Sequence, residues 1–140
     1  MKKLAWLSAF LAFNVFAADA DFVEVSDPFV RLVPDSAQNT GAFMLLKNKS
    51  DLAVFLVKAE NEASSKTELH AHANDNGVMK MVEVPEIEIP AKGEVALKPG
   101  SFHIMLMGLK APLVENQAID IALTFKDGSS QKLSAVVKKQ

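Results

Sequence analysis

Hydrophobic residues in this chain form short β-prone runs and alternating stretches, and turn-forming residues separate them. The runs are residues 29–33, 42–46, 52–57, 78–84, 87–89, 94–97, 102–107, 119–125 and 132–137. Asn76-Gly77 and Asp127-Gly128 are strong hairpin signals. No stretch carries the long 3.6-residue repeat of a helix, and only residues 59–67 are a candidate for a helical turn. The pattern predicts an all-β fold, a β-sandwich or Greek-key barrel.

The first residues have a different pattern. Met1-Lys2-Lys3 is basic, residues 4–13 are almost wholly apolar, and small residues follow. This is typical of a secretory signal peptide, and the apolar run is too short for a membrane span, which needs about 18 residues or more. We predict a signal peptide over residues 1–17 and a periplasmic protein. Cleavage after Ala20 is the second choice, and a buried N-terminal helix is the alternative to a signal peptide.

Composition narrows the function. A length of 140 residues favours one domain, residues 18–140 after cleavage, with no further membrane span. With a net charge of −2, the chain has no excess of positive charge that would favour binding to nucleic acid. The absence of cysteine excludes disulfides, thiolate zinc sites, iron–sulfur clusters, thiol nucleophiles and lipid attachment to cysteine.

The histidines and methionines are clustered. All three histidines and four of the six methionines lie between positions 70 and 107: His70, His72, Met79, Met81, His103, Met105 and Met107. In a strand, His103, Met105 and Met107 would share one face, opposite the apolar Ile104 and Leu106. Thioether sulfur suits Cu(I) and not the harder Zn²⁺ or Ca²⁺, and imidazole suits copper in either oxidation state. Without a cysteine ligand, a blue-copper role is excluded. The alternative is that each methionine is packing and each histidine is surface.

The spacing of four of these residues matches a known signature. His70, Met81, His103 and Met105 form the pattern H-x10-M-x21-H-x-M, within the words ELHAH, GVMKM and HIMLMGL. The pattern resembles that of the PCu(A)C family of periplasmic copper chaperones, and the likeness extends roughly from Val30 to Val137.

The resemblance implies a Greek-key β-sandwich similar to cupredoxins, with one exposed Cu(I) per chain held by His70, Met81, His103 and Met105. It implies delivery of copper to the dinuclear centre of cytochrome c oxidase subunit II, or to a related acceptor, and a Sco-type thiol protein as a further partner. Residues 134–140 contain no His or Met. The second, Cu(II) site that some members carry in their C-terminal tail is therefore not expected.

Further residues lie near the motif. His72, Met79 and Met107 are candidates for a supporting shell around the ligands, and Glu68 and Asn74 for hydrogen bonds to them, with packing or surface roles as the alternatives. We expect the protein to be a monomer. We also expect that it is not an enzyme, since Ser101 near His103 lacks a nucleophile elbow. Two other functions remain open: copper sequestration for resistance, and a metal-free interaction module.

Overall fold

The computed structural model describes residues 17–140, and these form ten strands and one helical turn. The predicted signal sequence lies outside the described residues except for its last position. The elements are α1 (Asp19–Phe22), β1 (Val23–Arg31), β2 (Asn39–Asn48), β3 (Val54–Asn61), β4 (Ser64–Asp75), β5 (Val78–Glu83), β6 (Ile87–Ile89), β7 (Glu94–Leu97), β8 (His103–Leu109), β9 (Ala118–Phe125) and β10 (Ser130–Lys138). Among residues 17–140, no helix has the length and apolar character needed to cross a membrane.

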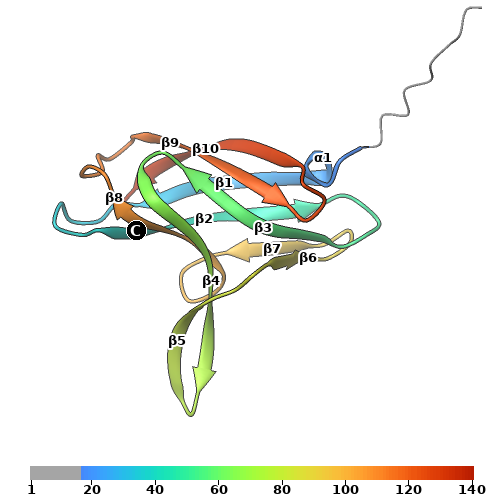
Figure 1. Cartoon of the computed structure of the whole chain (residues 1–140), viewed down its shortest axis with the longest axis horizontal. Coiled ribbons are helices and arrows are strands. Elements are labelled where there is room, and N and C mark those ends of the chain that lie inside the picture. Colours follow the sequence, from blue (N-terminus) through green and yellow to red (C-terminus); the bar gives the residue numbers. More distant parts are fainter. Residues whose placement is uncertain (1–16) are drawn as a thin grey trace, which may run out of the picture.

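The strands form one hydrogen-bonded sheet that folds over on itself (Figure 1). Its order is β5-β4-β8-β2-β1-β10-β9-β3-β6, and β7 also pairs with β2. Neighbours far apart in the sequence, such as β4 with β8 and β3 with β9, are typical of Greek-key connections. The structure confirms the predicted all-β sandwich. The sheet formed by the described residues does not close into a barrel.

Strand β1 joins the two layers. It pairs antiparallel with β2 on one side and parallel with β10 on the other. Its register with β2 shifts between Ser26 and Phe29, and Asp27 there has a φ of 52°. Such a bulge bends a strand, which allows β1 to leave one layer and enter the other.

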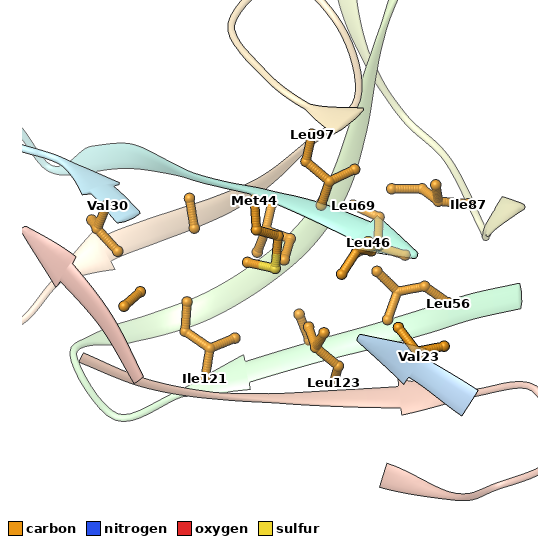
Figure 2. Packing of buried hydrophobic residues seen from close by; sticks show 14 of the residues in the cluster. Val23, Val30, Met44, Leu46, Leu56, Leu69, Ile87, Leu97, Ile121 and Leu123 are labelled. Carbon is orange, nitrogen blue, oxygen red and sulfur yellow. The ribbon is translucent and has the colours of Figure 1, made fainter. Parts of the chain in front are cut away.

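The core lies between the layers, and side chains from both meet there (Figure 2). Met44 and Leu46 from β2 face Leu56 of β3 and Leu123 of β9. Ile104 and Leu106 of β8 are fully buried in the same cluster. One face of β8 therefore packs in the core, as its alternation predicts. Its other face carries His103, Met105 and Met107.

The prediction of a helical turn at residues 59–67 is wrong. Residues 59–61 end β3 and residues 64–67 begin β4. Asn61 stabilises the corner between the two strands, because its side-chain amide donates to the hydroxyls of Ser64 and Thr67. Strand β4 has no apolar alternation over its first half, so its hydrophobic pattern gives no strand signal; pairing with β8 makes it a strand.

Core packing should dominate the stability. Leu56→Ala removes a side chain with no exposed surface and should cost about 2–5 kcal/mol of unfolding free energy. Leu52→Ala makes the same chemical change at a side chain that is 77% exposed, and should cost less than about 0.5 kcal/mol. Urea unfolding followed by circular dichroism measures both. Equal losses in the two variants would contradict this core.

Candidate metal centre

Strand register brings the predicted ligands to one face of the sheet. Strand β4 lies between β5 and β8 and pairs antiparallel with both. His70 is opposite His103, and Glu68 is opposite Met105, across the β4–β8 ladder. His72 is opposite Met81 across the β4–β5 ladder. Residues directly opposite in an antiparallel pair point to the same side, so imidazoles and thioethers share the face of β8 that is turned away from Ile104 and Leu106.

A small pocket opens on this face. Its volume is about 230 Å³, below the 300 Å³ or so at which pockets for small organic ligands begin. Four candidate metal donors line it: His72, Met81, His103 and Met105. Its remaining lining is Arg31, Val33, Asn39, Thr40, Gly41, Phe43, Pro99 and Gly100. The size and the donors fit an ion and not an organic molecule.

Glycine at position 41 leaves room for the Phe43 ring. Gly41 is opposite Met105 across the β2–β8 ladder. A Cβ atom at this position would come within 2.8 Å of the Phe43 ring. The ring therefore lies over the glycine and forms part of the pocket lining.

A larger hollow elsewhere has a different lining. It measures about 1020 Å³ and lies along residues 58–67 and parts of β9. Its lining has no histidine or methionine and mixes lysine with acidic and small residues. Size alone therefore does not identify the site, and the soft donors lie in the smaller pocket.

One backbone carbonyl orients two imidazoles. His103 Nδ1 donates to the carbonyl oxygen of Ser101 at 2.9 Å, and His72 Nδ1 lies 3.3 Å from the same oxygen. The rings of His72 and His103 are 5.4 Å apart between centroids. Because a carbonyl only accepts, each Nδ1 carries the proton, and the lone pair of each neutral ring is on Nε2. Within residues 17–140 neither Nε2 has a hydrogen bond, so both are free to bind a metal.

His70 is held differently. The residue is buried, with 8% exposure, and its Nε2 donates to Glu68 Oε2 at 2.7 Å. The other carboxylate oxygen of Glu68 accepts a hydrogen bond from Lys66 Nζ at 2.7 Å. The hydrogen bond from Lys66, and then that from His70, keep the pKa of the Glu68 carboxyl below its usual value. His70 Nδ1 is buried and has no partner among the described residues. An unpaired buried nitrogen is costly, and a bound ion would pair it.

Three of the predicted ligands meet in the pocket: Met81, His103 and Met105. His70 is not part of the pocket lining, but its ring lies 5.6 Å from that of His103 between centroids. Of the three supporting candidates, His72 is in the pocket, while Met79 and Met107 are not. Met79 is 59% exposed on β5.

The two hydrogen-bonding candidates have different roles. Glu68 contacts His70. Asn74 instead accepts the backbone N–H of Gly77 and stabilises the turn between β4 and β5. The Ser101 carbonyl was missed, because a backbone acceptor has no signature in the residue types.

The donor set defines the metal that fits. Within residues 17–140, no three side chains of His, Cys, Asp or Glu are arranged to hold one ion. The donors that line the pocket are two imidazoles and two thioethers. Thioethers and neutral imidazoles are soft, uncharged donors, which match Cu(I). Arg31 at the edge of the pocket adds positive charge, which disfavours a doubly charged ion further.

Solved structures with a similar fold include PCuAC domains and the protein DR1885. The apo PCuAC domain from PmoF1 superposes with a TM-score of 0.74 at 20% identity, over 88% of this chain and 98% of that domain. CuI-DR1885 from Deinococcus radiodurans, solved in solution, has a TM-score of 0.66 at 38% identity, over 83% of this chain and 79% of that one. The fold of this protein is therefore that of PCuAC domains.

The particular family follows from the sequence. The chain belongs to the LpqE-like family, described as "Putative lipoprotein LpqE-like", whose model matches residues 23–137. Two relatives are "Putative lipoprotein Lxx21020" of Leifsonia xyli subsp. xyli, 39% identical over 120 residues, and "Uncharacterized protein RP573" of Rickettsia prowazekii, 30% identical over 106 residues. The matches cover 85% and 75% of this chain, and 71% and 59% of the two relatives.

The burial of His103 allows a prediction of how the stability of the metal-free protein depends on pH. Burial lowers the pKa of His103 below its ordinary value of 6.5; the Ser101 carbonyl opposes this shift, and His70, His72 and Arg31 add to it. Protons therefore bind the unfolded chain more readily than the folded one, and the unfolding free energy should fall as pH drops below about 6.5. His103→Gln should reduce that slope in urea titrations between about pH 7.5 and 5.5. An unchanged slope in the variant would contradict the burial of a neutral imidazole.

Proposed function

We propose that this protein is an exported carrier of Cu(I), which binds one ion per chain and passes it to another protein. The observation that supports this most strongly is the convergence of Met81, His103 and Met105 on one small pocket, from strands separated in the sequence. A pocket with two thioethers and no thiolate is well suited to a soft monovalent ion. DR1885, which is 38% identical, has been solved in a CuI form.

The ligands we propose are His70, Met81, His103 and Met105. His103 and Met105 come from β8, a strand whose other face is fixed in the core. The unpaired, buried Nδ1 of His70 supports its place in the set, because a bound ion would satisfy it. Glu68 would fix the His70 ring through the opposite nitrogen, as partners of ligating histidines commonly do.

Release follows from the exposure of the donors. Met81 is 47% exposed and lies on the β4–β5 hairpin, which projects beyond the two layers (Figure 1). His103, by contrast, is only 3% exposed. An incoming donor from a partner can therefore bind the ion on the Met81 side before His103 dissociates from it. Such stepwise exchange avoids a free Cu(I) intermediate. No group in this sequence of events needs to act as a catalyst, so we propose no enzymatic activity.

The location we propose is the periplasm, after cleavage of the signal peptide behind Ala17. The residues just after this point support that choice over cleavage behind Ala20. Asp19 N–H donates to Asp127, and Ala20 N–H donates to Ser129. The carbonyl of Ala20 accepts from Gln131. Removal of residues 18–20 would break all these bonds, and the shorter signal peptide preserves them. This choice gives a single domain of residues 18–140.

The acceptor we propose is the dinuclear copper centre of cytochrome c oxidase subunit II or a related oxidase, with a Sco-type thiol protein as a further partner. The resemblance of the ligand motif supports this step. We also propose that the carrier is a monomer that binds no nucleic acid. In a monomer the exposed Met81 side of the site remains accessible to the acceptor.

Anaerobic titration tests the carrier. The wild type should bind one equivalent of Cu(I) in competition with a chromophoric Cu(I) chelator. Met81→Ala and His103→Ala should each weaken binding by about 100-fold or more, while circular dichroism shows an intact fold. Met79→Ala, the matched loss of a thioether on the same strand outside the pocket, should leave the affinity unchanged. A wild type that binds no Cu(I) would leave only the metal-free interaction module.

Deletion of the gene tests the purpose of binding. A carrier predicts low oxidase activity in copper-poor medium, restored by added copper, because the acceptor is then filled without help. Restoration by the wild-type gene and not by a Met81→Ala copy is the control. Normal oxidase activity together with sensitivity to copper would instead identify a sequestration protein.

A further inference from the structure

The pocket contains a histidine that the four-ligand motif leaves out. We infer that His72 is a direct Cu(I) ligand of this protein and alternates with His70 as the imidazole that joins His103 around the ion. The inference rests on the proposed Cu(I) binding and adds a fifth donor to it. The site would then bind one ion, and either of two imidazoles on β4 could serve as a ligand.

The position of His72 supports direct binding. It lines the same pocket as Met81, His103 and Met105, whereas His70 does not. It is directly opposite Met81 in the β4–β5 ladder, so the two side chains leave the sheet on the same side. Its ring lies 5.4 Å from that of His103, which is as close as the 5.6 Å between His70 and His103.

The hydrogen bonds of His72 leave the required nitrogen free. Its Nδ1 faces the Ser101 carbonyl, the acceptor that His103 Nδ1 also uses. Both rings therefore have the same tautomer and present Nε2 as the metal-binding atom. His70 is the opposite case, since Glu68 engages its Nε2 and leaves the buried Nδ1. His72 can thus bind without breaking any interaction that involves a charged group.

Alternation follows from the geometry of the three rings. His70 and His72 both lie beside His103, with ring centroids 5.6 and 5.4 Å away, but only His72 lines the pocket. The two β4 imidazoles therefore approach His103 from different positions, and we expect His103 to pair with one of them at a time. His72 is half-buried at the pocket, and His70 is almost fully buried. An ion held by His72 lies nearer the solvent, where a partner can reach it, and an ion held by His70 is more protected.

Single and double variants test this redundancy. Cu(I) affinity is measured by chelator competition for the wild type, His70→Ala, His72→Ala and the double variant. If either imidazole can serve, each single loss should be about tenfold or less, and the double loss should exceed the product of the two by about tenfold or more. As a second readout, Cu(I) should shift the ¹⁵N resonance of His72 Nε2 in the His70→Ala variant. Met79→Ala is the control for nonspecific effects of the hairpin.

The outcomes separate this inference from the function on which it rests. If His70→Ala alone loses as much affinity as the double variant, and His72→Ala binds like the wild type, His72 is not a ligand and the inference is overturned. The carrier function would survive that result. A wild type with no Cu(I) affinity would instead overturn the proposed function itself.

Discussion

The antiparallel register of β4 against its two neighbours is the constraint on which the site depends. A shift of one residue in either ladder would turn the ligands of one strand to the other face. Core packing of Ile104 and Leu106 on the inner face of β8 prevents such a shift there. At the hairpin the turn prevents it, because Asn76 and Gly77 have φ values of 51° and 85°, as a two-residue type I′ turn requires. The core and one tight turn thus fix the positions of donors that come from three different strands.

Much of this arrangement could be predicted because it depends on local patterns. Alternation on β8 assigned Ile104 to the core and His103 to the outer face, and the Asn-Gly pair marked the hairpin. Strand β4 was not evident, since Ser, Lys, Thr and Glu at its start have no apolar period and become a strand only by pairing with β8. The Ser101 carbonyl was also not evident. It belongs to the segment between β7 and β8, two strands that pair with different parts of β2, and this long-range pairing places it beside the histidines.

The site combines donors on a strand anchored in the core with a donor on an exposed hairpin, which suits the proposed carrier role. His103 and Met105 belong to a strand anchored in the core, whereas all six residues of β5, including Met81, are exposed. Binding on the anchored side gives the ion a defined position, and exposure on the hairpin side leaves a route for a partner's donor. Neutral ligands suit both requirements, because they stabilise a singly charged ion without the strong attraction of a thiolate. The same face has more soft donors than one ion needs, so exchange among them needs no change in the fold.

The coordination of the loaded protein tests the central claim most directly: two imidazoles and two thioethers, distant in sequence, share one Cu(I). X-ray absorption of the anaerobic Cu(I) form distinguishes nitrogen from sulfur neighbours. The account predicts both kinds around a single copper, with the sulfur contribution reduced in Met81→Ala and in Met105→Ala. A first shell of nitrogen and oxygen alone, unchanged in both methionine variants, would contradict it.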